Sequence, residues 1–435
     1  MRIIVFLFFI IAPVFIQAQV KPHSDSILGM HAARPLPKEI AERHFYFKGF
    51  AIIINDDAAD ENNNHLLVGE IRALETEETN RDAGINKVFN LKGYCNDSPM
   101  GIVITTDKEY KVLQIAPSYI GKKVVYDAGT KTFTIGANFL DYISVGGNSF
   151  SAWQPVIVQI GLDLQGKTCF IKRNYSCFLD NFEMENNNIL IFATSENPKI
   201  DDKNSEGAEM ITVNTAKVHK DSAREWIPVA DVLSDVETPY KEIGRMTLSE
   251  ISKADDAYYF TTSNLDQFTL KSSNHLYQLK NNVLKETMDF PDYIKWNNEY
   301  SDWVNINGFW VDAQKEYVFF THVAATRKQI VFSKTGLNLN MISSQKIPLN
   351  DYADFDKMLP LPDGNIVVLR INAVDTWSYF IYDTKMEVIK EVNSGISKKY
   401  YPNRLKALTG NMLECLFYID NVNKKDCVLQ TVELD

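Results

Sequence analysis

Apolar runs separated by short polar turns recur along the chain. The stretch "LPLPDGNIVVLR", residues 359–370, shows the pattern: a short inner segment, a turn and then a β-rich apolar run. Comparable segments occupy residues 182–194, 252–262, 310–322 and 406–418. A strand, a tight turn and a second strand are expected after each segment, except that only one strand follows 406–418. The equivalent positions are spaced by 68, 60, 49 and 46 residues and are Ile189, Ala257, Tyr317, Ile366 and Met412.

The repeating unit is therefore four strands, and residues 123–136 and 156–172 fit its hairpin template. Runs such as "NIVVL" and "NILIF" lack polar alternation, which predicts sheets covered on both faces. In these features the chain resembles β-propellers as an architecture, over residues 44–435. The resemblance implies an all-β fold of about seven four-stranded blades, with six or eight as alternatives. No Trp-Asp dipeptide or other signature of a named propeller family accompanies it.

Helical periodicity is scarce. The best helical candidates are "PLPKEIAERH" near the N-terminus and "SAREWIPVADVLSDV", residues 222–236. Both lie outside the repeat cores.

The last repeat is one strand short. It holds three predicted strands, at 404–408, 412–419 and 427–434. An unpaired outer strand would expose a row of backbone donors and acceptors. We expect the strand-like segment His44–Ile54 to pair beside 427–434 and so to close the propeller with an N-terminal strand in the last blade.

The N-terminus has the layout of a secretory signal peptide. Arg2 precedes an apolar run over residues 3–16, and small and polar residues surround Ala18. We expect cleavage after Ala18 or Gln19; the alternative is an uncleaved signal anchor. The predicted organisation is a signal peptide at 1–19, an N-terminal arm at 20–43 and the propeller at 44–435. The mature protein is expected in the periplasm or outside the cell, with no membrane insertion after cleavage.

Charge narrows the range of partners. The formal net charge is −11, and no basic run offsets it. An acidic protein repels phosphate backbones, so nucleic acid is excluded as an expected partner.

The chain has five cysteines, Cys95, Cys169, Cys177, Cys415 and Cys427. No CxxC pair occurs, which argues against a thiolate zinc site. In an exported protein, Cys415 with Cys427 and Cys169 with Cys177 are possible disulfides. The alternative is buried thiols.

No catalytic or metal-binding motif is present. The histidines lack metal-ligand spacing such as HExxH, and there is no GxSxG elbow or phosphate loop. Asp202–Gly207 copies the start of a calcium loop, but Val213 stands where a bidentate Glu is required. The acidic, Asn-rich segment Asn55–His65 is expected to be a loop first and a cation site second. No cofactor and no metal are expected, and catalytic residues are unknown.

Aromatic residues concentrate in Tyr293–Trp310. Trp296 and Tyr300 stand in loop-like sequence and are the candidate binding residues, because aromatic side chains on loops can stack on sugars or anchor a partner protein. Trp303 and Trp310 are instead expected to belong to a blade's inner strand and fill the core.

The resulting functional hypothesis is a secreted, non-enzymatic β-propeller that recognises a partner protein or glycan. Loops on one face would carry the binding, notably 196–208 and 217–251. A monomer is expected. The alternative is a polysaccharide hydrolase or lyase with its site in the central funnel.

Overall fold

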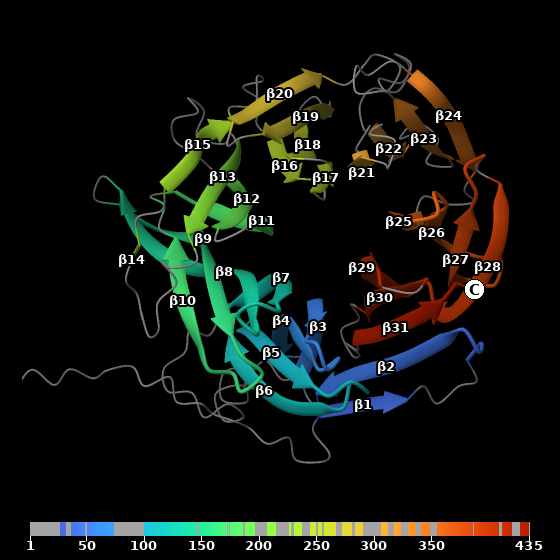
Figure 1. Cartoon of the computed structure of the whole chain (residues 1–435), viewed down its shortest axis with the longest axis horizontal. Helices are drawn as coiled ribbons and strands as arrows, with labels where there is room; N and C mark the ends of the chain where they lie inside the picture. The colour runs from blue at the N-terminus through green and yellow to red at the C-terminus, as the bar shows by residue number, and fades with distance from the viewer. Residues whose placement is uncertain are drawn as a thin grey trace, which may run out of the picture.

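In a computed structural model the chain is all-β, and its strands form antiparallel sheets arranged in a ring (Figure 1). The structure describes these strands and their short turns. Residues 1–26, 74–99, 196–206, 215–225 and 290–305, with shorter stretches between other strands, lie outside the described residues. Among the residues described, no helix has the length and apolar character needed to cross a membrane.

One nine-stranded sheet joins the two ends of the chain. Its order is β29 (Tyr400–Ala407), β30 (Met412–Ile419), β31 (Cys427–Glu433), β2 (Ile40–Phe47), β3 (Phe50–Ala59), β4 (His65–Ala73), β5 (Met100–Thr106) and β6 (Val112–Ser118), with β1 (Ile27–His31) beside β2. Strands β2 and β3 share the single register pair Phe47–Phe50. At this pair the sheet divides into two four-stranded units, one made of β29–β31 with β2 and the other of β3–β6.

Five further sheets lie around the ring. They comprise β7 (Ile120–Asp127), β8 (Thr132–Val145), β9 (Asn148–Ile160) and β10 (Gly166–Ile171), with β14 (Trp226–Ile227) on β10; β11 (Cys177–Glu185), β12 (Asn188–Ser195), β13 (Gly207–Asn214) and β15 (Ala230–Val236); β16 (Gly244–Leu248), β17 (Ser252–Ala254), β18 (Ala257–Asp266), β19 (Ser272–Lys280) and β20 (Val283–Asp289); β21 (Ile306–Val311), β22 (Tyr317–His322), β23 (Gln329–Thr335) and β24 (Met341–Pro348); and β25 (Phe355–Pro360), β26 (Ile366–Ile371), β27 (Thr376–Tyr382) and β28 (Val388–Ser397). Each of these sheets is one blade, and so is each unit of the nine-stranded sheet. The blades are numbered in chain order: β3–β6 form the first blade, and β29–β31 with β2 form the last.

The repeat positions found in the sequence coincide with one structural position. Ala257, Tyr317, Ile366 and Met412 each begin the second strand of a blade, and Ile189 is the second residue of its strand. The lack of polar alternation has the expected cause. In β26, Val367 and Leu369 pack into the core shared with the last blade, whereas Ile366 and Val368 pack toward β21 and β24.

The N-terminal strand that pairs beside β31 is Ile40–Phe47, not His44–Ile54 as predicted. Its register runs from Ile40 opposite Val432 to Phe45 opposite Cys427. Residues 50–59 instead form the first strand of the next unit and pair with β4. The predicted boundary at residue 43 therefore falls inside β2.

Both helical candidates are strands. "IAERH" lies in β2, and residues 226–227 and 230–236 form β14 and β15. β2 and β15 each complete a sheet that would otherwise lack an outer strand, and β14 adds a fifth strand beside β10. This pairing overrides a weak local periodicity. For the same reason 217–251 is not the single loop predicted, because β14, β15 and β16 run through it.

Short turns begin with a carboxylate that caps them. Asp60, Asp107 and Asp383 each accept hydrogen bonds from the backbone N–H groups two and four residues later. In the turns that start at Asp60 and Asp107, the fourth residue has a positive φ of 60°. These residues are Asn63 and Tyr110. Asp is favoured in such turns because its side chain bonds to its own following backbone.

Candidate functional site

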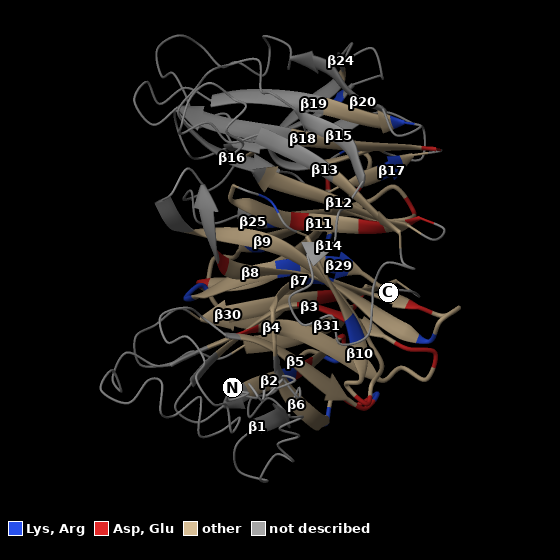
Figure 2. Ribbon diagram, turned by 90° about the vertical axis from the view of Figure 1, so that its left-hand side faces the viewer, with Lys and Arg blue, Asp and Glu red and all other residues tan. Residues whose placement is uncertain are grey.

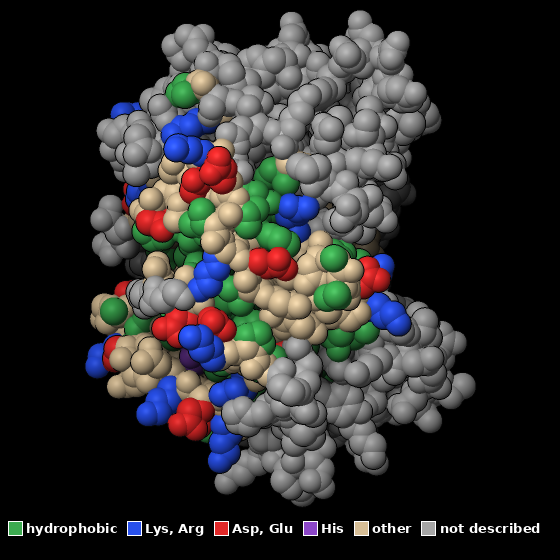
Figure 3. Space-filling view, turned by 90° about the vertical axis from the view of Figure 1, so that its right-hand side faces the viewer, with side chains coloured by type: hydrophobic (Ala, Val, Ile, Leu, Met, Phe, Trp, Pro, Cys, Tyr) green, Lys and Arg blue, Asp and Glu red, His purple; other side chains and the backbone are tan. Residues whose placement is uncertain are grey.

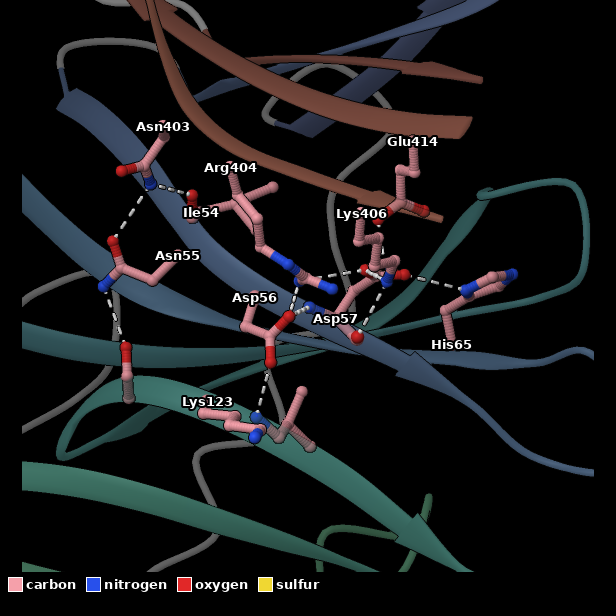
Figure 4. A network of polar contacts seen from close by, with 12 residues as sticks. Ile54, Asn55, Asp56, Asp57, His65, Lys123, Asn403, Arg404, Lys406 and Glu414 are labelled. Carbon is pink, nitrogen blue, oxygen red and sulfur yellow. Dashed lines mark hydrogen bonds and ion pairs between the residues drawn. The ribbon is translucent and has the colours of Figure 1, made fainter. Parts of the chain in front are cut away.

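Polar side chains of three inner strands meet where the last, first and second blades join (Figure 4). Asn403 of β29 donates to the backbone oxygen of Ile54 (2.7 Å) and to Oδ1 of Asn55 (3.2 Å). Asn55 of β3 donates in turn to the backbone oxygen of Gly121 of β7, at 2.8 Å. Side-chain amides therefore connect the three strands in sequence.

Asp56 and Asp57 continue the contacts along β3. The Asp56 carboxylate forms an ion pair with Arg404 of β29 and accepts the backbone N–H of Val124 of β7 at 2.7 Å. Asp57 forms an ion pair with Lys406, whose ammonium also donates to the Asp57 backbone oxygen at 3.1 Å. Residue numbers rise together on β29, β3 and β7, so these inner strands run parallel.

Asp57 lies at the centre of a buried group that also holds His65, Lys406 and Glu414. His65 Nδ1 is 3.1 Å from Asp57 Oδ2, and Lys406 Nζ is 2.8 Å from Glu414 Oε1. The side chains of Asp57 and Glu414 are 1% and 2% exposed. We call Asp56, Asp57, His65, Tyr110, Arg404, Lys406 and Glu414 the Asp57 cluster.

Burial and neighbouring charges shift the pKa values of the two carboxyl groups in opposite directions. Burial alone raises the pKa of Asp57, but the Lys406 charge and hydrogen bonds from His65, Glu414 and Lys406 outweigh it and hold that pKa well below its usual range. For Glu414, burial and then the negative charge of Asp57 raise the pKa to about 8. Glu414 therefore carries the proton at neutral pH, and Asp57 the charge.

Tyr110 covers this group from the turn between β5 and β6. Its ring stacks on His65 with centroids 4.0 Å apart, and its hydroxyl donates to Glu414 Oε2 at 3.0 Å. Burial raises the pKa of this hydroxyl far above its ordinary value, so it stays a donor. A φ of 60° is costly for a bulky side chain, and the Asp107 turn holds it there.

The Asp57 cluster has the composition of an acid–base site but not the access of one. Two carboxyl groups with separated pKa values are the usual basis for general acid and base roles. Here, however, their oxygens are directed at Lys406, Arg404, His65 and Tyr110. Because both carboxyl groups are almost fully buried, the cluster's evident role is to fasten the last blade to the first.

Similar contacts continue around the inner strands. Lys123 of β7 donates to Asn181 (2.9 Å) and Glu183 (2.7 Å) of β11, and Lys253 of β17 lies 3.5 Å from Glu185. Charged side chains therefore bridge the last blade to the first, the first to the second, the second to the third and the third to the fourth.

A second buried cluster fastens β2. Glu42 is 1% exposed and contacts His44 at 2.7 Å, while its other oxygen accepts from Gln430 Nε2 at 2.6 Å. Gln430 also donates to the backbone oxygen of Ser394 and accepts from the Tyr379 hydroxyl, both at 3.0 Å. A side chain of β2 is thereby connected through β31 to the preceding blade.

A small cavity of about 210 Å³ opens between the last two blades. Its volume is below the roughly 300 Å³ at which small-molecule pockets begin. Lys390 on its wall donates to the backbone oxygen of Leu434 at 3.1 Å, and Asp363 accepts from Asn365. On this side of the molecule charges of both signs are interspersed with hydrophobic side chains (Figure 3). The lining residues are Leu361, Asp363, Asn365, Ile381, Ile389, Lys390, Asn411 and Leu434.

Several predicted site residues lie outside the described residues: Trp296, Tyr300, Trp303, Cys95 and the calcium-like residues 202–206. Trp310 lies in β21 and packs against the core, as expected. The prediction of a loop over Asn55–His65 is wrong for most of its length, since β3 runs to Ala59 and only the Asp60–Asn64 turn follows. Within the described part of the chain, no group of His, Cys, Asp or Glu side chains has the arrangement of a metal site.

The four described cysteines are buried thiols rather than disulfides. In the register of β30 and β31, Cys415 lies opposite Gln430 and Cys427 opposite Tyr418. Cys415 and Cys427 consequently face different cores, one toward the preceding blade and one toward the first. Cys169 lies in β10, the fourth strand of the second blade, and Cys177 begins β11, the first strand of the third blade. Both pack in one apolar core.

Sequence reasoning missed Tyr110, Arg404, Lys406 and Glu414. The available signal was the pair Asp56–Asp57 following the apolar run "AIII", because charges inside a strand need partners when buried. Their partners lie about 350 positions away in sequence, and no local pattern indicates them.

No protein-family model and no curated protein matches the chain. Among solved structures it is similar to BBS1N in complex with ARL6DN, with 8% identity, a TM-score of 0.45 and coverage of 89% of this chain and 94% of that one. It is also similar to the β-propeller domain of the Trilobed protease from Pyrococcus furiosus, with 7% identity, a TM-score of 0.40 and coverage of 88% of this chain and 93% of that one. A third similar structure is the Penicillium chrysogenum α-L-arabinanase complexed with arabinobiose, with 9% identity, a TM-score of 0.41 and coverage of 94% of this chain and 99% of that one. Likeness at this level carries no inference about activity.

Proposed function

We propose that the protein is an exported β-propeller that binds a partner protein or a glycan through one face of the ring. The observation that supports this proposal is the difference between the two faces. Because the inner strands run parallel, the turns between first and second strands, and between third and fourth strands, gather on one face. We call it the turn face. The other connections gather on the opposite face, the connection face.

The turn face is built largely of tight, capped turns. Those at 60–64, 107–111, 161–165 and 361–365 are each closed by a backbone hydrogen bond between the first and fifth residues. In the ribbon, many positions of Asp, Glu, Lys and Arg lie in turns and strand ends along one edge of the ring (Figure 2). Such turns leave little chain with which to build a specific site.

The two longest stretches between successive described strands, residues 74–99 and 290–305, join strand ends that lie on the connection face. The end of β12 and the start of β13, which residues 196–206 join, lie on the same face. Long connections on a rigid scaffold are where binding function concentrates. Trp296 and Tyr300 lie in the connection between β20 and β21, which makes them the candidate binding residues.

A hydrolase or lyase acting on polysaccharide is the second candidate. The observation in its favour is the Asp57–Glu414 pair, with one ionised and one protonated carboxyl group. Near-complete burial of both carboxyl groups speaks against it, and binding remains the better-supported function.

The test is a glycan array and a pull-down with the mature protein, followed by Trp296→Ala and Tyr300→Ala. We expect each variant to weaken binding to the recovered ligand at least about tenfold, with thermal stability unchanged. Leu113→Ala is the matched control, because Leu113 is 46% exposed beside a turn of the opposite face. A stability loss of about 3–5 kcal/mol in the Trp variant would identify it as a core residue and refute the site.

A further inference from the structure

The second blade carries a two-stranded ribbon that extends past its neighbours. Strands β8 and β9 pair from Phe133–Ile160 to Val145–Asn148. The first strand of the blade, β7, reaches only as far as Asn138, and the fourth strand, β10, only as far as Val156. Residues 139–145 and 148–155 therefore continue as a ribbon beyond the four-stranded sheet. Since β8 and β9 are second and third strands, this ribbon rises from the connection face.

Two buried amide side chains anchor the base of the ribbon. Asn138 donates to the backbone oxygen of Leu179 (2.9 Å) and accepts its N–H (2.7 Å), as a strand partner would. Gln154 likewise donates to the backbone oxygen of Tyr175 (2.9 Å) and accepts the N–H of Arg173 (2.7 Å). Both Asn138 and Gln154 are fully buried. The ribbon is thus held at a fixed angle to the third blade.

The two faces of the ribbon differ at its base. Phe139 packs edge-on against Phe170, with ring centroids 5.2 Å apart. On the other face Leu140 is 38% exposed and lies opposite Trp153 in the register. Trp153 is half-buried and makes an edge contact with Phe178, over which the Lys122 ammonium sits 4.9 Å from the ring centre. Leu140 and Trp153 therefore form an apolar pair on this face at the base of the ribbon, and Leu140 is exposed.

The two edges of the ribbon are not equivalent. On the β9 side, Pro155 lacks a backbone donor. Gln154 contacts Arg173 and Tyr175, and the Ser176 hydroxyl accepts the Trp153 N–H at 3.3 Å, so these residues lie across the edge. On the β8 side, no described strand pairs with residues 139–145 other than β9. Charged side chains, especially Lys, and Pro usually protect a strand edge. The sequence "FLDYISV" has no Lys or Pro, and Asp141 is its one charged residue.

We propose that the β8 edge, residues 139–145, binds an extended segment of a partner polypeptide by strand addition. The inference rests on the proposed binding function and names its ligand class. A strand edge offers backbone donors and acceptors at peptide spacing, which a polypeptide matches and a glycan does not. Apolar partner residues contact Leu140, and a basic residue lies beside Asp141. The chain already adds a strand to this blade, because Trp226–Ile227 pairs in parallel with Phe170–Ile171 on β10.

The probe is a displayed library of random 12-residue peptides selected on the mature protein. A selected peptide should slow amide exchange over residues 139–145 at least tenfold in hydrogen-exchange mass spectrometry. Two versions, N-methylated at odd or at even residues, should differ: only the one that blocks the amides facing β8 loses binding. Asp141→Lys should weaken binding of a basic peptide tenfold or more without changing the unfolding temperature, whereas Leu113→Ala should not.

Failure to select any peptide, protection confined to other segments, or equal losses for both N-methylated peptides would each overturn strand addition. These outcomes leave the proposed function intact if the Trp296→Ala and Tyr300→Ala variants lose binding to an array or pull-down ligand. Loss of peptide binding in those two variants, with 139–145 unprotected, would place the site on the 290–305 connection instead.

Discussion

Lys406 donates to both the carboxylate and the backbone oxygen of Asp57, a residue 349 positions earlier in the chain. The contact joins the first strand of the last blade to the first strand of the first blade. Beside it, Arg404 pairs with Asp56, and Glu414 shares the Lys406 ammonium. Both ends of the sequence are therefore fastened at the inner strands as well as through β2.

Asp57→Asn should strongly destabilise the protein. The substitution leaves Lys406 facing a neutral amide in a buried site, whereas Arg404 keeps its ion pair with Asp56. Breaking one partner of a buried pair costs about 3–5 kcal/mol. Urea unfolding at pH 7 measures the change. Asp163→Asn, in an exposed turn where the side chain accepts only the Gln165 N–H, is the control and should cost under about 0.5 kcal/mol. Equal small effects for both would show that the Asp57 contacts contribute little.

Glu414 should make stability fall as pH rises. Its pKa is about 8 in the folded protein against an ordinary 4.5, so the folded state keeps a proton that the unfolded chain releases. Between pH 5 and 8 this contributes up to about 1.4 kcal/mol of lost stability per pH unit. Glu414→Gln cannot titrate, so its stability relative to the wild type should improve over this range. Parallel pH profiles would contradict the assignment.

Removing the N-terminal strand should unfasten the last blade. Deleting residues 20–47 from the mature chain removes β2, exposes the edge of β31 and leaves Gln430 without Glu42. We expect a far larger loss of stability than from deleting residues 200–206, which join two paired strands. Glu42→Ala supplies a milder version, with a loss of about 1–3 kcal/mol from the unsatisfied Gln430 donor. Similar unfolding midpoints for the two deletions would show that β2 is dispensable.

Export should leave a new N-terminus near Gln19 or Val20. The apolar run at residues 3–16 behind Arg2 has the length of a cleaved signal rather than of a membrane span. Intact-mass measurement of the protein recovered outside the cytoplasm tests this directly. An exported chain that retains Met1 would instead support the signal-anchor alternative.

The repeat could be predicted from the sequence because it is a local property. Each blade places an apolar second strand directly after a polar turn, so "NIVVL" and "NILIF" mark equivalent positions without reference to any distant residue. The need for a fourth strand beside Cys427–Glu433 was also readable, because unpaired strand edges are unfavourable. Its location near the N-terminus followed, although the strand is Ile40–Phe47 rather than the more apolar His44–Ile54.

What the tertiary structure alone decided is which distant side chains meet. Cys415 and Cys427 flank a hairpin in the sequence, yet the pairing register turns them toward different cores. Asp56 and Asp57 suggested a solvated loop, yet β3 carries them into contact with Arg404 and Lys406. The ribbon formed by residues 139–145 and 148–155 arose because β7 and β10 stop short of β8 and β9. Strand patterns depend on neighbours along the chain, whereas the cores and ion pairs that join the last blade to the first depend on residues hundreds of positions apart.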